Sequence, residues 1–283
     1  IAEQEIPTRF TEDALTEAML AAPTDDECLT CHHMKTLARD VGRSGTLTVD
    51  PSTLSHSAHA KLACVRCHTD ATSAKHPPQL ARVRCTRCHV KERDHLEQSV
   101  HLRVGEGDPE QGCIKCHGGA HQVEVPQGRA LCARCHPKET RDYDSSVHGV
   151  ARANGDSDAS TCSDCHGSSH DVVPTDDPRS KVSRDSLTNT CARCHEDREL
   201  MIRRKITIPD AVQLFRNSVH GRSTKSKAAH CNDCHESHRM RRADDPTSSI
   251  YRKNIEKTCG RCHRKEAEAY QIGVHGQAVT RGV

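Results

Sequence analysis

A five-residue string, Cys-x-x-Cys-His, occurs nine times in this chain of 283 residues. Its cysteine pairs are Cys28 and Cys31, Cys64 and Cys67, Cys85 and Cys88, Cys113 and Cys116, Cys132 and Cys135, Cys162 and Cys165, Cys191 and Cys194, Cys231 and Cys234, and Cys259 and Cys262. The histidines that complete them are His32, His68, His89, His117, His136, His166, His195, His235 and His263. We number these strings 1 to 9 in chain order. They contain all 18 cysteines, so no thiol remains for another purpose.

The spacing within each string fits the attachment of haem c. Two thiols three positions apart can add to the two vinyl groups on one porphyrin edge, and the next imidazole then reaches the iron. Zinc sites and thiol redox pairs also use Cys-x-x-Cys, but neither needs a histidine after every second cysteine. Nine pairs also cannot be divided into four-cysteine zinc sites without a remainder. The strings therefore predict nine covalently attached haems, each with a proximal histidine.

The composition lacks what an ordinary hydrophobic core needs. Aromatic residues make up 2% of the chain, tryptophan is absent and charged residues make up 28%, with a mean hydropathy of -0.77. A polypeptide of this kind leans toward disorder unless apolar cofactors supply the surface to bury. We expect a mostly irregular fold with short α-helices and little or no β-sheet, wrapped around an elongated chain of haems. The haem-free chain should lack a cooperative fold.

The net charge of the chain and the cellular compartment in which haem is attached exclude some classes of function. The formal net charge is +2, and the two propionates of each haem would more than offset it. We therefore expect a solvated surface of mixed charge, with some propionate pairing, and no nucleic-acid partner. Haem attachment of this type is completed outside the cytoplasm, which predicts a periplasmic or extracellular protein whose signal peptide has been removed. No run of 18 apolar residues predicts a membrane span.

The order of the strings predicts three segments. Residues 1–27 carry no string and include a helix pattern that begins after Thr11 and stops at Pro23. Residues 28–276 form a nonahaem region of loose two-haem repeats, and residues 277–283 form a C-terminal tail. The sequence stops where the repeat would call for another string. It leaves open a native chain that continues with a further haem or an anchor.

The repeat contains two kinds of string. One kind has arginine before its second cysteine: Arg66, Arg87, Arg134, Arg193 and Arg261. All but the first lead into charged helical stretches that should end at His101, His148, His220 and His275, three of which precede a glycine suited to the C′ position. The other kind is followed by a trailing histidine: His121, His170 and His238. String 2 is a hybrid, with His76 after it and His56 or His59 before it.

The supply of second axial ligands can be counted. Removing nine proximal histidines from 22 leaves 13. Five belong to the helix-end class (His59, His101, His148, His220 and His275) and four to the trailing class (His76, His121, His170 and His238). The four methionines Met19, Met34, Met201 and Met240 do not follow the repeat, so we expect bis-histidine haems of low potential. The remaining His33, His56, His95 and His230 are expected on the surface or in loops.

The pairing of ligands with haems is only partly predictable. A trailing histidine cannot easily wrap around to the far face of its own porphyrin, so it should bind a neighbouring haem. A helix-end histidine could serve either the preceding haem or the next repeat. In the second case His275 has no haem left, and it could cap a haem in a following subunit, which would give head-to-tail assembly.

The motifs CHGGAH, CHGSSH and SVHG resemble those of multihaem c-type cytochromes over residues 28–276. These include the MtrA-type decahaem conduits, the pentahaem donors of nitrite reduction and extracellular cytochrome nanowires. The resemblance implies electron transfer in respiration, with other cytochromes or a quinol-oxidising membrane complex as partners, and self-assembly or a place in a membrane complex.

The alternative is a multihaem oxidoreductase, of the kind that reduces nitrogen or sulfur oxyanions, with one open haem iron. Such enzymes are associated with Cys-x-x-Cys-Lys or a cross-linked tyrosine. The sequence contains no Cys-x-x-Cys-Lys, and its three tyrosines Tyr143, Tyr251 and Tyr270 have packing contexts, so no enzyme activity is expected.

Overall fold

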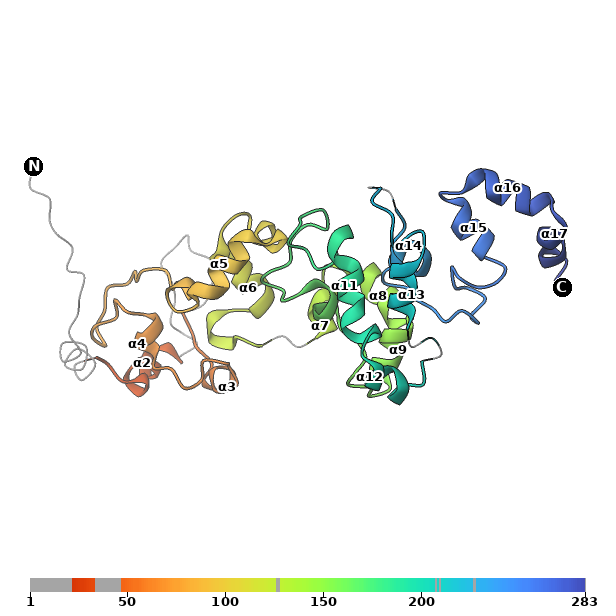
Figure 1. Cartoon of the computed structure of the whole chain (residues 1–283). Helices are drawn as coiled ribbons and strands as arrows, with labels where there is room; N and C mark the ends of the chain where they lie inside the picture. The colour runs from red at the N-terminus through yellow and green to blue at the C-terminus, as the bar shows by residue number, and fades with distance from the viewer. Residues whose placement is uncertain are drawn as a thin grey trace, which may run out of the picture. The chain divides into compact units, whose positions relative to one another are not determined.

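The computed structural model describes residues 22–33, 47–125, 128–206, 208, 210–225 and 228–282 (Figure 1). Short helices joined by turns and irregular segments make up all of this part of the chain, and none of it forms a strand. The fold class predicted from the sequence is therefore confirmed. The helix predicted after Thr11 lies outside the described residues.

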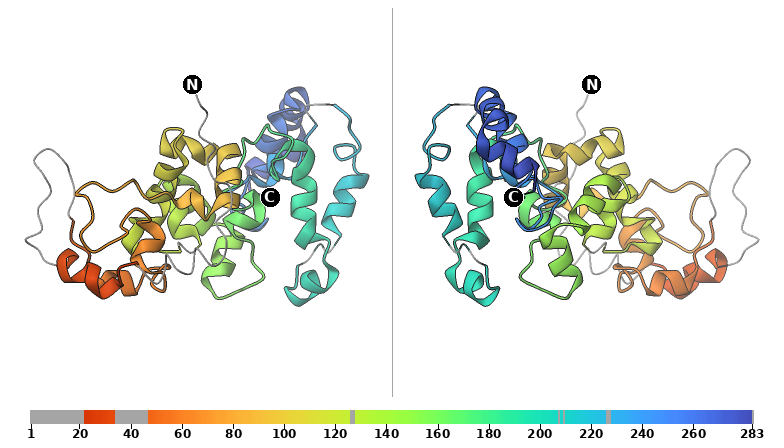
Figure 2. Two further views of the ribbon diagram at one scale, coloured as in Figure 1. Left: turned by 90° about the vertical axis from the view of Figure 1, so that its left-hand side faces the viewer. Right: turned by 90° about the vertical axis from the view of Figure 1, so that its right-hand side faces the viewer.

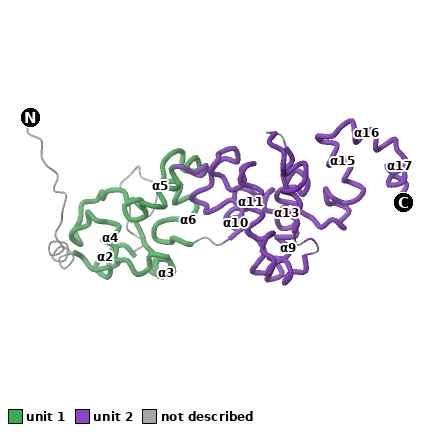
Figure 3. The backbone as a smooth tube through the Cα atoms, viewed as in Figure 1, with its two compact units in different colours: residues 1–97, 102–125 green, residues 98–101, 126–283 purple. Residues whose placement is uncertain are grey.

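The contacts between Cα atoms divide the chain into two compact units (Figure 3). Unit 1 consists of Ile1–Glu97 and Leu102–Val125, and unit 2 consists of Gln98–His101 and Pro126–Val283. Each unit contains several strings, so the region predicted as residues 28–276 is distributed over both.

The helices as far as residue 122 are short and several have clear N-terminal caps. They are α2 (Asp25–His32), α3 (Pro51–Ser55), α4 (Cys64–Cys67), η1 (Cys85–Arg87), α5 (Val90–Gln98), η2 (Val100–Gly105), α6 (Pro109–His117) and η3 (Ala120–Gln122). Asp50 and Asp108 each accept a backbone N–H in the first turn that follows them, with proline at the first helical position. Thr24 and Glu27 form a capping box at the start of α2. Local sequence thus fixes where these helices begin.

Further short helices follow from residue 129 onward, and the longest of them has 12 residues. They are α7 (Arg129–Ala133), α8 (Pro137–Asp144), α9 (Val147–Ala153), α10 (Cys162–His166), α11 (Arg184–His195), α12 (Arg198–Arg203), α13 (Ala211–Asn217), α14 (Cys231–His235), α15 (Ile255–Gly260), α16 (Arg264–Ile272) and α17 (Val274–Thr280). The charged stretches after strings 3, 5, 7 and 9 form α5, α8, α12 and α16, as predicted. Near the C-terminus, α16 contacts both α15 and α17 (Figure 2).

The glycines of the VHG motifs have a different role from the one predicted. Gly149 and Gly276 lie inside α9 and α17, so His148 and His275 stand at the beginning of a second helix and not at the end of the first. A Cβ atom on Gly149 would lie 2.0 Å from the carbonyl oxygen of Tyr143, and Gly276 has the same relation to Tyr270 at 2.1 Å. Glycine is needed because the chain folds back sharply onto the preceding helix. The prediction of a C′ glycine was wrong for these two residues and also for Gly221, which lies beyond the Ser218 C-cap of α13.

Little of the described polypeptide is buried. The buried apolar side chains are Ala71, Leu96, Ala192, Met201 and Val212. Large apolar side chains such as Val219, Ile272 and Val274 are about four-fifths exposed, at 83%, 78% and 78%. A chain of this size normally buries most of its apolar surface, so these side chains call for an apolar cofactor to cover them. No described helix is both long enough and apolar enough to cross a membrane.

Candidate haem sites

Each string forms a single helical turn or the end of a helix. Strings 1, 4, 6, 7 and 8 lie in α2, α6, α10, α11 and α14. In strings 2, 3, 5 and 9 the histidine N–H donates to the carbonyl of the first cysteine at 2.8–3.0 Å, which closes the turn. Residues three and four apart share one face of a helix. Both thiols of a string therefore point to the same side, as attachment to one porphyrin edge requires.

First cysteines of neighbouring strings lie close together. The Cys85 and Cys113 thiols are within hydrogen-bonding reach, as are those of Cys191 and Cys231. The same holds for strings 1 and 2 through Cys28 and Cys64 and for strings 5 and 6 through Cys132 and Cys162. The hydrogen bond from Cys191 lowers the pKa of the free Cys231 thiol to about 7, whereas burial raises that of Cys64 to about 12. Porphyrins attached at adjacent thiols would have their edges close together.

The imidazole rings come together in pairs whose centroids lie about 6 Å apart, with ring planes that range from parallel to nearly perpendicular. We say that the two rings of such a pair face each other, whatever the angle between their planes. The pairs, with the distance between ring centroids, are His32 and His76 (5.9 Å), His59 and His89 (5.8 Å), His68 and His121 (6.0 Å), His101 and His136 (6.4 Å), His148 and His195 (6.2 Å), His166 and His238 (6.0 Å), and His220 and His263 (5.9 Å). Each pair contains one proximal histidine and one from the helix-end or trailing class.

This spacing matches two imidazoles on opposite sides of one metal ion. Metal–imidazole bonds of about 2 Å, plus about 1.1 Å from each nitrogen to its ring centre, place the centroids roughly 6 Å apart. Across the described ranges, no group of three or more His, Cys, Asp or Glu side chains could hold a metal ion. Two axial imidazoles without further protein ligands fit an iron whose four equatorial nitrogens come from a porphyrin. The residues present therefore fit haem.

The pairs follow a regular offset along the chain. The helix-end histidines His59, His101, His148 and His220 face the proximal rings of strings 3, 5, 7 and 9. Each thus faces the next string with arginine before its second cysteine, which is the second of the two alternatives left open by the sequence. The trailing histidines His76, His121 and His238 face strings 1, 2 and 6, each of which precedes their own string. This arrangement is the one required if each iron is bound by the proximal histidine of one string and by a second histidine that lies next to another string.

Hydrogen bonds and burial prepare these rings as metal ligands. The Nδ1 atoms of His32, His76 and His101 donate to the carbonyl oxygens of Leu47, Pro77 and Ser169 at 2.7–2.8 Å. A carbonyl can only accept, so Nδ1 carries the proton and Nε2 keeps its lone pair for a metal. Burial lowers the pKa of His148 and His166, which favours the neutral, metal-binding form.

Residues 38–136 match the class III cytochrome c family. The matched stretch contains strings 2 to 5 and ends on the last residue of string 5. This match is consistent with a multihaem c-type cytochrome, in agreement with the family resemblance at this level, and it supports covalently bound haem c. No curated protein and no solved structure matched the chain.

The sequence reasoning missed a set of serines that stand just before the helix-end histidines and hydrogen-bond to the backbone there. Ser57, Ser99, Ser146 and Ser218 each stand two positions before a helix-end histidine. Ser57 and Ser99 accept the N–H of that histidine at 3.2 Å, and Ser146 and Ser218 donate to the carbonyl six residues before the VHG glycine. The recurrence of Ser-x-His could have revealed them. His275 has Gly273 in this position.

The arginines that define one class of string form contacts with the string before them. Arg193 donates to the carbonyl oxygen of Asp164 in string 6. Arg261 donates to the equivalent carbonyl of Asp233 in string 8 at 3.4 Å, and Arg87 donates to Thr69, just after string 2, at 2.9 Å. The sequence pattern marked these residues, but it did not show what they bind. They hold consecutive strings together.

Four further histidines were expected to bind iron: His117, His170, His235 and His275. His117 and His170 have other contacts, including a hydrogen bond from Nδ1 of His117 to the Glu124 carbonyl at 3.0 Å. His235 and His275 face no imidazole among the described residues of unit 2. The count of nine second ligands for nine irons stays a prediction.

Among the four histidines expected in loops or on the surface, three have local environments that can be described. His33 and His56 are exposed, and their Nδ1 atoms bond to backbone carbonyls one turn earlier, at Leu29 and Ser52. His230 directly precedes string 8 and has a buried Nδ1 with no hydrogen-bond partner. Met201, one of the four methionines, is 1% exposed and packs in the core.

Proposed function

We propose that this protein transfers electrons through nine covalently bound haems, one in each string. The observation that carries the proposal is the set of seven facing imidazole pairs, because their 5.8–6.4 Å spacing is what bis-histidine ligation of one iron requires. Haem iron supplies the one-electron chemistry when bound. Paired imidazoles leave such an iron no position for a substrate, so they favour electron transfer over catalysis.

The neighbouring thiols support a continuous path. First cysteines of strings 1 and 2, 3 and 4, 5 and 6, and 7 and 8 adjoin one another, and the Cys165 thiol of string 6 lies near Cys194 of string 7. Because electron tunnelling slows steeply with distance, adjacent attachment edges favour rapid transfer from string to string. The chain then serves as a conductor between a donor and an acceptor.

The compartment and partners follow from the same proposal. Covalent haem attachment supports an exported, periplasmic or extracellular protein. Its partners are redox proteins, either other cytochromes or a quinol-oxidising membrane complex. Assembly head to tail, or as a subunit of a membrane complex, is part of the proposal.

Haem counting and redox titration test the proposal that this protein transfers electrons through nine haems. The purified protein should carry the mass of nine haems above its 31.2 kDa polypeptide. Its Soret spectrum should show low-spin iron, and an electrochemical titration should show several low-potential steps. A mass equal to the bare polypeptide would contradict haem attachment. A mass that corresponds to fewer than nine haems would mean that some strings carry no haem, and peptide mapping would identify those strings.

The rival proposal is a multihaem oxidoreductase, and one observation favours it. That enzyme needs an iron that substrate can reach, and His235 is a proximal histidine without a facing imidazole in unit 2. Turnover of nitrite, hydroxylamine or sulfite by the reduced protein would support the oxidoreductase. Absence of turnover together with rapid electron exchange would support the conductor.

A further inference from the structure

Three backbone hydrogen bonds of the same kind recur beside the second axial histidines. In each one the donor is the residue directly before a helix-end histidine, and the acceptor is the residue two positions after a trailing histidine. The bonds run from the N–H of Ala58 to Val123, from Val100 to Val172 and from Val147 to Met240, at 2.8, 2.8 and 2.9 Å. We call each of these bonds a joint. Because both ends keep the same offset in all three, the joint is a repeated element of the fold.

A buried serine holds the donor end of each joint. Ser57, Ser99 and Ser146 directly precede the three donors and are 7%, 6% and 1% exposed. The Ser99 hydroxyl also donates to the Val172 carbonyl at 2.9 Å, so this acceptor receives two hydrogen bonds. Ser146 is the N-cap of α9 and accepts the N–H of Gly149 at 3.1 Å. Local contacts therefore fix the donor as well as the joint does.

The joint between Val147 and Met240 ties together the second ligands of strings 6 and 7. Val147 directly precedes His148, whose ring lies 6.2 Å from the proximal ring of string 7. Met240 stands two residues after His238, whose ring lies 6.0 Å from the proximal ring of string 6. Two short backbone segments and one hydrogen bond thus connect the two rings.

The joint between Ala58 and Val123 does the same in unit 1. His59, directly after Ala58, faces string 3 at 5.8 Å, and His121, two residues before Val123, faces string 2 at 6.0 Å. Adjoining first cysteines were found within strings 1 and 2, 3 and 4, and 7 and 8. These two joints instead fall at the steps from string 2 to 3 and from string 6 to 7.

We propose that Ala58 and Val147 are positioning residues whose backbone N–H groups fix the second axial ligands of two consecutive haems and thereby set the rate of electron transfer between them. The inference rests on the proposed function. One electron leaves the iron of one string, which is oxidised, and reduces the iron of the next, and no proton or ligand moves. A continuous path of covalent and hydrogen bonds couples two sites more strongly than an open gap of the same length.

Val147→Pro tests the joint without breaking α9. Val147 is the first residue of that helix, where proline is favoured, and Ser146 has φ −81° and ψ 166°, in the extended region that suits the residue before a proline. The substitution removes the donor N–H alone. We expect a protein with nine low-spin haems and a several-fold loss of current through a single layer of it between two electrodes.

Electron paramagnetic resonance of the ferric protein gives a second readout. The g values of a low-spin haem depend on the angle between its two axial imidazole planes, which is 17° at string 6 and 72° at string 7. Val147→Pro should shift one signal of each type. The signal of string 1, whose planes meet at 12°, should stay unchanged as an internal reference.

Val274→Pro is the matched control. Val274 is the first residue of α17 and precedes His275, but among the described residues no hydrogen bond of its N–H joins it to another string. This variant should keep both the current and the resonance signals. Equal current in Val147→Pro and the unchanged protein would overturn the inference and leave electron transfer through nine haems intact. A high-spin signal in Val147→Pro would also overturn it, because the joint would then serve only to keep a ligand on its iron.

Two further outcomes are decisive. If Val147→Pro fails to fold, Ala58→Pro removes the joint of unit 1, and the same loss of current with low-spin haems supports the inference, whereas an unchanged current overturns it. A starting protein without haem would overturn the proposed function itself.

Discussion

Residues 162–195 and residues 231–263, both in unit 2, are two versions of one sequence pattern. Each begins with a string that has aspartate before its second cysteine, continues through an Asp-Asp-Pro turn and ends with a string that has arginine there. Asp164 and Asp233 accept the backbone N–H three residues earlier at 2.7 and 2.8 Å. The two segments therefore share their local construction.

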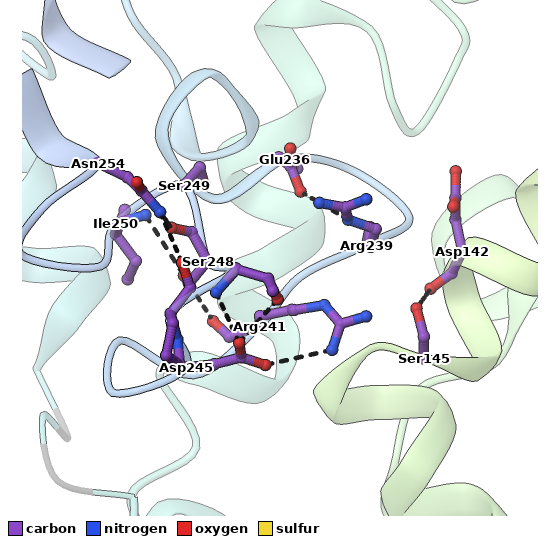
Figure 4. A network of polar contacts seen from close by, with 12 residues as sticks. Asp142, Ser145, Glu236, Arg239, Arg241, Asp245, Ser248, Ser249, Ile250 and Asn254 are labelled. Atoms are coloured by element: carbon purple, nitrogen blue, oxygen red, sulfur yellow. Dashed lines mark hydrogen bonds and ion pairs between the residues drawn. The ribbon is translucent and has the colours of Figure 1, made fainter. Parts of the chain in front are cut away.

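The Asp-Asp-Pro turns are also built alike. Asp177 accepts the N–H of Arg179, and Asp245 accepts the N–H of Thr247, both at 2.8 Å. In the second segment the turn is further held by the ion pair from Arg241 to Asp245 and by hydrogen bonds among Ser248, Ile250 and Asn254 (Figure 4). Ser249 also donates to the carbonyl of Cys234, which fixes the turn against string 8.

The two segments differ in whether an imidazole from elsewhere in the chain faces the histidine of their first string. His238 faces His166 of string 6, whereas no ring in unit 2 faces His235 of string 8. A glycine follows string 6 and a strained glutamate follows string 8. Similar local sequence thus forms similar turns, but the second ligand depends on a residue dozens of positions away.

The largest effect should come from removing the ring that distinguishes the segments. His238→Ala removes the imidazole that faces His166 of string 6. We expect about one additional carbon monoxide site per molecule and a new high-spin ferric signal, because the iron loses a strong axial nitrogen. Optical titration of the reduced protein measures both. His56→Ala, which changes an exposed histidine bonded only to nearby side-chain and backbone oxygens, should leave binding unchanged.

A smaller effect should come from exchanging the residues that follow the strings. Glu236→Gly should stabilise the protein by about 1 kcal/mol, because glycine adopts φ 65° without strain. The lost contact to Arg239, at 3.7 Å, is a solvent-exposed ion pair of little value. Guanidinium unfolding followed in the Soret band gives the free energy of unfolding.

The reciprocal change provides the control for that experiment. Gly167→Glu places a side chain at φ 90° and should destabilise the protein by about 1–3 kcal/mol. If Glu236→Gly instead lowered the free energy of unfolding, the glutamate would have a favourable role that outweighs its backbone conformation.

The arginines should give the next smaller effect. Arg193 and Arg261 occupy equivalent positions, but the bond from Arg261 to Asp233, at 3.4 Å, is near the limit for a hydrogen bond. We expect Arg193→Gln to cost about 1 kcal/mol and Arg261→Gln clearly less. Unfolding experiments on both variants and on exposed Arg222→Gln measure the difference. Equal costs for Arg193 and Arg222 would mean that the contact with string 6 adds no stability.

Local patterns made the strings and many helices predictable. The cysteine and histidine spacing within strings, the charged stretches that became α8 and α16 and the absence of described strands follow from residues close in sequence. The role of Gly149 was predicted wrongly, because a glycine after a helical stretch is usually the C′ residue that ends the helix. Its actual role depends on the close approach of the Tyr143 carbonyl, which is a contact between two helices. Sequence counting likewise gave nine second ligands without showing which ring each one faces.

The roles of Ser146, Arg193 and Glu236 escaped prediction for a related reason. Each depends on a contact or a backbone angle that the residue type alone does not specify. Ser146 donates to Tyr143 in the preceding helix, and Arg193 reaches back to Asp164 in another string. Glutamate normally avoids positive φ, so nothing in the sequence marked position 236.

The smallest effect concerns the response of the two Asp-Asp-Pro turns to acid and salt. A hydrogen bond from Arg179 lowers the pKa of Asp177, and one from Thr247 lowers that of Asp245. Because both folded pKa values lie below the unfolded value of about 3.9, each carboxylate stabilises the fold fully above that pH. The stabilisation is lost as pH falls through the folded pKa.

Salt should separate the two turns, since Asp177 is paired chiefly with a charged guanidinium and Asp245 chiefly with a neutral hydroxyl. Asp177→Asn should lower the free energy of unfolding at pH 7 in low salt and have less effect in high salt. Asp245→Asn should retain more of its effect, although its ion pair with Arg241 at 3.2 Å is also screened. Urea unfolding at pH 7 and pH 3, each at two salt concentrations, measures this. Equal salt sensitivity of the two variants would show that Arg241, and not the Thr247 hydroxyl, dominates at Asp245, and the second turn would then be held by charge as the first one is.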